Sequence, residues 1–142
     1  MLRVLVPIDG SENALRALRY IMGSRDLYRE PIELHLLNVQ IPIASGAVKM
    51  FISQQQMNDY YREEGMKALA AARILLDQEG LNHHHHIGVG EIAATIVGYA
   101  RDKRCQQIVI GSRGGGGFTG ALLGSTAIRV AQLTDVPVLL VK

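Results

Sequence analysis

The sequence lacks several features that would assign it to a specialised class of protein. Its 142 residues contain one cysteine, Cys105, which excludes an internal disulfide framework and is typical of a reducing cytoplasm. No run of about 18 apolar residues predicts a membrane span, and Pro7 and Asp9 follow the first apolar residues too soon for a signal peptide. The net charge of +2 is too small to predict binding to nucleic acid or to a membrane surface. We therefore expect a cytoplasmic protein with neither partner.

What the chain does contain is an alternation of two hydrophobic patterns. Short apolar or alternating runs predict strands at residues 4–8, 32–39, 83–89, 107–110 and 136–141. Amphipathic stretches predict helices at residues 12–22, 53–79, 91–103 and 125–133. Residues 41–52 show no clear period and are expected to form a mobile loop. Since no linker or repeat interrupts this order, we predict a single α/β domain over residues 1–142 with an open, mostly parallel sheet.

Glycine is concentrated in one stretch, residues 108–127, which holds seven of the fifteen glycines. Such a cluster costs backbone entropy on folding, so it indicates a backbone that bends sharply or closely approaches another group. A loop rich in N–H groups that leads into a helix N-terminus is suited to binding phosphate. The stretch therefore predicts a nucleotide site.

Three phosphate-binding motifs can be compared with this stretch. A Walker A loop requires a Gly-Lys pair, and none occurs in the chain. Gly115, Gly117 and Gly120 match a dinucleotide fingerprint, but they precede the last strand instead of opening the first βαβ unit, and no acidic residue ends the following strand. The third motif is Gly111-x2-Gly114-x9-Gly124-Ser125.

On this third spacing the chain resembles the universal stress proteins, because the spacing matches their ATP-binding signature. Residues 6–11, Val-Pro-Ile-Asp-Gly-Ser, match the family's opening strand and turn, and residues 136–141 match its closing strand. The resemblance covers essentially the whole chain. It implies a three-layer open sheet of five parallel strands in the order 3-2-1-4-5, with four helices. In such sheets ligands bind where the direction of winding reverses, which lies here between the first and fourth strands.

The resemblance also implies roles for individual residues. Pro7, Asp9 and Val39 would surround the adenine and ribose of ATP, and Gly111 and Gly124 would line the ribose and phosphates. The phosphate contacts would be Gly114, Ser125 and Thr126, at a helix start where N–H groups carry partial positive charge. Asp9 is a candidate ligand of Mg²⁺ and equally a candidate helix cap.

Three further residues near these positions bear on the site. Arg113 and Arg129 are candidates to reach phosphates, although solvated surface arginines are more frequent. Ile92 departs from the family pattern, which commonly has proline after Gly90-Glu91. That change removes a rigid helix start but no ligand contact.

A run of four histidines, residues 83–86, lies in the third predicted strand. His83 and His85 would face one side of the sheet, and His84 and His86 the other. Histidines two residues apart can share a metal ion, but the adjacent sequence offers no cysteine or pair of carboxylates to complete a site. We therefore favour polar residues that protect an edge strand from unwanted pairing.

The function implied by the resemblance is that of an ATP-binding, regulatory or signalling dimer in a stress response, with an unknown protein partner. The homodimer would pair through the last strand, residues 136–141, and so remove an apolar sheet edge. The sequence shows no set of catalytic residues, so at most slow ATP hydrolysis or autophosphorylation is expected. A nucleotide-free interaction module on the same fold is the alternative.

Overall fold

The computed structural model describes residues 1–43, 45–113 and 124–142. Along these residues the elements alternate as the hydrophobic patterns predict. The strands are β1 (Leu2–Pro7), β2 (Ile32–Gln40), β3 (His83–Val89), β4 (Gln107–Gly111) and β5 (Val138–Val141). The helices are α1 (Glu12–Gly23), α2 (Gly46–Phe51), α3 (Gln54–Gln78), α4 (Ile92–Asp102) and α5 (Ser125–Leu133), with a 3₁₀ turn at Arg25–Leu27.

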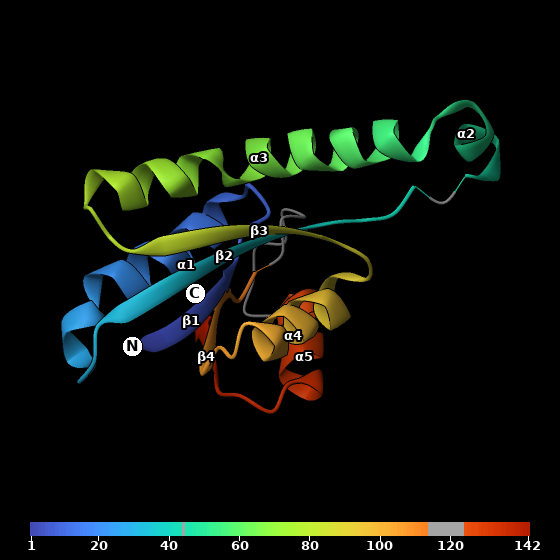
Figure 1. Ribbon diagram of the computed structural model, residues 1–142. Coiled ribbons are helices and arrows are strands. Elements are labelled where there is room, and N and C mark those ends of the chain that lie inside the picture. Colours follow the sequence, from blue (N-terminus) through green and yellow to red (C-terminus); the bar gives the residue numbers. More distant parts are fainter. Residues whose placement is uncertain (44, 114–123) are drawn as a thin grey trace.

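The strands form one parallel sheet in the order β3-β2-β1-β4-β5, which confirms the predicted topology. The sheet lies between two layers of helices (Figure 1). Helices α1 and α3 pack on one face, over a core that includes Val6, Leu18 and Leu69. Helices α4 and α5 pack on the other face, over residues such as Leu5 and Ile108. The order places β1 and β4 side by side, so their carboxyl ends meet at the switch point.

The prediction of a loop over residues 41–52 is wrong for half of that segment, because Gly46–Phe51 forms the short helix α2. The Ser45 side chain caps it by accepting a hydrogen bond from Val48 N. The described residues thus contain one α-helix more than the four expected. Helix α2 is only six residues long and buries none of them, so the sequence has no buried apolar stripe there from which a helical period could be recognised.

Helix α3 begins at a capping box, in which Ser53 and Gln56 exchange hydrogen bonds. Its one internal glycine, Gly65, is buried against β3: a Cβ atom there would lie 2.7 Å from Ile87 Cδ1. The glycine therefore lowers helix propensity but allows the helix to approach the sheet closely. None of the helices in the described residues combines the length and hydropathy that crossing a bilayer requires.

Candidate functional site

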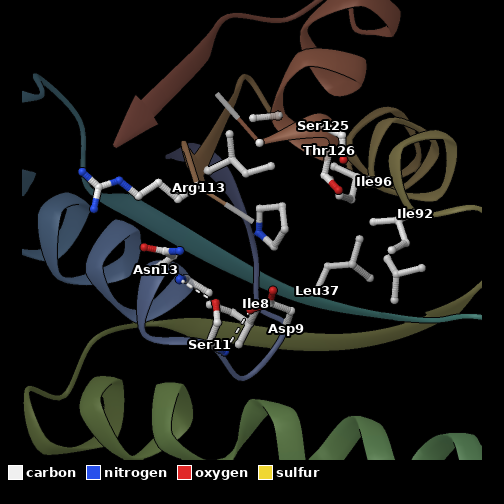
Figure 2. A pocket seen from close by; sticks show the side chains of 17 residues that line it. Ile8, Asp9, Ser11, Asn13, Leu37, Ile92, Ile96, Arg113, Ser125 and Thr126 are labelled. Atoms are coloured by element: carbon white, nitrogen blue, oxygen red, sulfur yellow. Dashed lines mark hydrogen bonds between the residues drawn. The ribbon is translucent and has the colours of Figure 1, made fainter. Parts of the chain in front are cut away.

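A cavity of about 330 Å³ opens where the carboxyl ends of β1 and β4 meet (Figure 2). Its wall includes seven of the eight residues expected to contact a nucleotide. These are Pro7, Asp9, Val39, Gly111, Gly124, Ser125 and Thr126. The eighth, Gly114, lies outside the described residues, as do Gly115, Gly117 and Gly120. Segments distant in the sequence thus meet at one crevice, as the topology predicts.

One side of the cavity is apolar. Leu37 and Val39 on β2 line it together with Ile92 and Ile96 on α4. Figure 2 shows Leu37, Ile92 and Ile96 grouped on the side away from Arg113. The volume lies within the usual range for small-molecule sites, and an apolar wall with few polar groups is typical of them.

The end of β1 is held by a residue that the sequence patterns did not single out. Asn38 is 3% exposed, and its Nδ2 donates a 2.8 Å hydrogen bond to the Ile8 carbonyl oxygen. The Ile8 N–H donates to the Leu37 carbonyl oxygen, at 2.7 Å. These two bonds fix the chain between β1 and α1, and thereby the position of Asp9 at the cavity.

Asp9 is a candidate both for the cap of α1 and for a Mg²⁺ ligand, and the structure shows which residue caps the helix. Ser11 is the N-cap, since its Oγ accepts a hydrogen bond from Ala14 N. Asp9 Oδ1 accepts from Ser11 N, at 2.9 Å, and its side chain remains at an exposed position on the cavity wall. Asp9 therefore shapes the turn before the helix and is also available to a ligand.

The polar side of the cavity is the N-terminus of α5. Gly124 is the N-cap and, having no side chain, provides no side-chain hydrogen bond to the first turn. Ser125 and Thr126, in that turn, line the cavity. Gly124 N donates to the Ser112 carbonyl oxygen at 2.5 Å, which joins the residue after β4 to the start of α5. The unpaired N–H groups of a helix start attract anions.

The position of Gly111 requires a residue without a side chain. A Cβ atom at Gly111 would lie 2.9 Å from the backbone oxygen of Asn13, in the first turn of α1. That oxygen belongs to the main chain and has little freedom to move. Glycine here therefore lets β4 and α1 approach each other beside the cavity.

The charged residues near the cavity differ in position. Arg113 lies on its wall, whereas Arg129 lines a neighbouring hollow that also includes Ser125 and Thr126. Glu91 caps α4 by accepting hydrogen bonds from Ala93 N and Ala94 N. The helix start is therefore secured without the proline that Ile92 replaces.

The histidine run divides between the two faces of the sheet, as the strand period predicts. His84 lies beside His35 of β2, and His86 lies beside Leu37. His35 Nδ1 and His86 Nε2 are hydrogen-bonded at 3.0 Å, and His84 Nε2 lies 2.6 Å from Glu33 Oε1. Glu33 and His35 are distant from the run in the sequence, and strand pairing brings them beside it, so the residues adjacent to the run do not reveal them as candidate ligands.

Burial and hydrogen bonding set the protonation states of His35, His86 and Glu33. It lowers the pKa of His35, a shift that Glu33 opposes, and it lowers the pKa of His86 to about 4, a shift that His35 reinforces. Both rings are therefore neutral at pH 7. Burial acts to raise the pKa of Glu33, but hydrogen bonds from His84 and Arg3 outweigh it and lower this pKa, so the carboxylate is ionised.

Comparison with known proteins relates this architecture to one family. The model of the universal stress protein family matches residues 1–142. A universal stress protein of Bacillus subtilis is 30% identical, the match covering 99% of this chain and 98% of that protein. One from Methanocaldococcus jannaschii is 28% identical over 99% of this chain and 81% of the relative.

Solved structures share the fold over the whole chain. A hypothetical protein whose biochemical function was assigned from its structure has a TM-score of 0.83 and 28% identity, covering 99% of this chain and 95% of that one. An Arabidopsis thaliana family member with AMP bound has a TM-score of 0.72 and 19% identity, covering 100% and 92%. An Archaeoglobus fulgidus universal stress protein in complex with dAMP has a TM-score of 0.67 and 23% identity, covering 100% and 98%.

Proposed function

Since the chain belongs to the universal stress protein family, we propose that its cavity binds ATP and that the protein acts as a nucleotide-dependent regulatory dimer in a stress response. Family members with AMP or dAMP bound share its fold. The observation that carries the proposal is one cavity lined both by an apolar wall and by a helix N-terminus that has no side-chain cap. An adenine base suits the first and a phosphate chain suits the second.

In this proposal the base lies against Leu37, Ile92 and Ile96, and a backbone group of Val39 serves its edge. Ser125 and Thr126 contact the phosphates through the first turn of α5, with Gly114 completing the contacts. Asp9 faces the ribose and holds a Mg²⁺ ion that neutralises phosphate charge, consistent with the few carboxylates that this ion takes from proteins. Arg113 adds positive charge at the same wall.

The dimer is proposed to form through residues 136–141. Strand β5 is an edge of the sheet, and its Leu140 is exposed. Pairing with the same strand of a second copy would give its free N–H and C=O groups partners and cover its apolar side chains. In a monomer these backbone groups and apolar side chains would remain in contact with water.

The test uses Ser125, whose side chain is exposed at the start of α5. Ser125→Glu places a negative charge where the phosphates would lie, and an acid in the first helical turn does not destabilise the helix. We expect the affinity for Mg-ATP to fall at least about tenfold, because like charges repel strongly at a site partly shielded from water. Isothermal titration calorimetry measures the affinity, and adenosine, which has no phosphate, serves as the comparison ligand.

Ser125→Gln is the matched control, as it has nearly the size of the glutamate but no charge. It should retain more ATP affinity than Ser125→Glu, while adenosine binding stays the same in both variants.

Mass spectrometry of the denatured wild-type protein should detect co-purified ATP. If neither co-purified nucleotide nor heat of Mg-ATP binding is found, the chain is a nucleotide-free module. Light scattering on the same sample gives the assembly mass, and a monomeric mass would contradict the dimer.

A further inference from the structure

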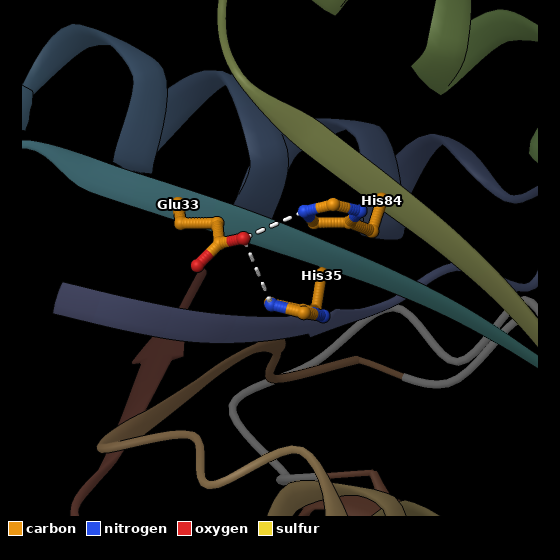
Figure 3. Close-up of side chains that lie close together, drawn as sticks. All are labelled: Glu33, His35 and His84. Atoms are coloured by element: carbon orange, nitrogen blue, oxygen red, sulfur yellow. Dashed lines mark hydrogen bonds and ion pairs between the residues drawn. The ribbon is translucent and has the colours of Figure 1, made fainter. Parts of the chain in front are cut away.

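Three side chains of the types that bind metals converge on the sheet face that carries α4 and α5, away from the cavity. Glu33 and His35 belong to β2 and His84 to β3, and their ligating atoms all lie within 4.8 Å of one another. We call these three residues the histidine–glutamate cluster. Figure 3 shows a nitrogen of each histidine directed at the same oxygen of Glu33. The distances to that oxygen, Oε1, are 2.6 Å from His84 Nε2 and 3.9 Å from His35 Nε2.

The strongest indication of a ligand is the ring of His35. This residue is 6% exposed, yet its Nε2 has no hydrogen-bond partner within the described residues. A buried polar atom without a partner is costly, and such atoms in native proteins call for an explanation. At 3.9 Å, Glu33 Oε1 is too distant for a hydrogen bond. A cation between the two atoms would bind both.

The surroundings of the cluster are those of a supported metal site. His35 Nδ1 is hydrogen-bonded to His86 Nε2, so a metal at His35 Nε2 selects the tautomer in which Nδ1 donates this bond. Arg3 Nε donates to Glu33 Oε2, at 3.2 Å, and leaves Oε1 for the metal. Metal-binding histidines and carboxylates are usually oriented by such outer hydrogen bonds.

From this geometry we propose that Glu33, His35 and His84 bind a divalent transition-metal ion, with water at the remaining position. Two imidazoles and one carboxylate suit Zn²⁺, Co²⁺, Ni²⁺ or Cu²⁺ and not Mg²⁺ or Ca²⁺. A tetrahedral ion with bonds of about 2.05 Å separates its ligand atoms by about 3.3 Å, which lies between the two observed distances. His84 is half-exposed and free to turn by the small amount required, and the proton of its Nε2 passes through solvent to Nδ1 as the metal takes its place.

The charges near the cluster determine how strongly it is expected to bind a metal ion. Glu33 contributes one negative charge, whereas Arg3 and Lys103 lie close enough to lower the pKa of His35. Their positive charge opposes a cation. Binding should therefore be stoichiometric but weaker than at a closed structural zinc site.

The experiment titrates Zn²⁺ into the chelator-treated, nucleotide-free protein by calorimetry, and follows Co²⁺ by its visible absorption. The wild type should bind one equivalent, and His84→Ala should lose affinity by more than about tenfold. His85→Ala is the matched control: it removes an exposed histidine from the same run, but one that faces the other side of the sheet. It should leave the affinity unchanged.

Glu33→Gln provides a second variant, because it keeps the shape of the side chain while removing its charge, and it should weaken binding as His84→Ala does. Circular dichroism confirms that each variant is folded. Equal losses in His84→Ala and His85→Ala would show adventitious binding to the histidine run and overturn the proposal. So would a wild-type protein that binds no metal. Since nucleotide is absent throughout, neither result depends on the proposed ATP site.

Discussion

One face of strand β2 carries both the edge of the cavity and the histidine–glutamate cluster, and the two are built differently. Alternate residues along this face are Glu33 and His35 in the cluster, then Leu37 and Val39 at the cavity. At the cavity, β2 contributes apolar wall, and the polar groups come from loops and helix ends beyond β1 and β4. In the cluster, the polar groups belong to the strands themselves. A ligand site can therefore arise at the end of a sheet or within its surface.

The comparison extends to the buried polar residues of β2. Asn38, beside the cavity, has hydrogen-bond partners for both its amide nitrogen and its oxygen. His35, in the cluster, has a partner for Nδ1 and none for Nε2 within the described residues. A fully paired group stabilises the fold on its own, whereas a group with an unpaired atom is expected to gain stability from a ligand.

The largest effect on stability is expected at Asn38. Asn38→Ala leaves the buried Ile8 carbonyl without its side-chain donor, and we expect the free energy of unfolding to fall by about 2 kcal/mol. Gln40→Ala is the control: Gln40 Nε2 donates to Asn38 Oδ1 at 2.6 Å but is partly exposed, so its loss should cost less than about 1 kcal/mol. Urea denaturation followed by circular dichroism measures both. Equal costs would mean that the Ile8 bond contributes nothing beyond the Gln40 bond.

A smaller effect on stability is expected at Gly65. Helix propensity alone predicts that alanine there stabilises the protein, and we expect the opposite. Replacement of a helical glycine by alanine normally stabilises, and Gly98→Ala in α4 should do so by up to about 1 kcal/mol, since nothing lies within 4 Å of its Cβ position. Gly65→Ala should instead destabilise by about 1 kcal/mol, because its Cβ would overlap Ile87. Thermal unfolding compares the two.

The Gly65 variant also tests how α3 holds β3 in the sheet. In an Ile87→Ala background the overlap is gone, and the same substitution should become stabilising. If Gly65→Ala stabilises in both backgrounds, Ile87 moves aside without cost, and the packing of α3 does not constrain the strand that carries His84.

These differences explain which features the sequence predicts. The strands follow from hydrophobic periods. The resemblance to the family, carried by one motif, implies the sheet order and singles out Gly111, Gly124 and Ser125, because a phosphate loop is a local run of residues. The cluster depends on the register that pairs His35 with His84, and no local pattern specifies a contact across 49 positions. Helix α2 was missed because it buries no face. Asn38 is a polar residue in an otherwise apolar strand, and the sequence alone does not show that its side chain donates to the Ile8 carbonyl oxygen.

The smallest effect is expected at Cys105, and it tests whether the cluster is complete without a sulfur ligand. The thiol is 4% exposed, and burial above all raises its pKa to about 11, with Glu33 adding to the shift. At pH 7 the thiol is therefore protonated and is a poor metal ligand. Cys105→Ala should change the Zn²⁺ affinity by less than about twofold, since metal binding depends on deprotonated ligands. The Co²⁺ complex of the wild type should show no thiolate charge-transfer band. Such a band, together with a loss of affinity in the variant, would make Cys105 a ligand of the metal and remove Glu33 as the ligand that completes the site.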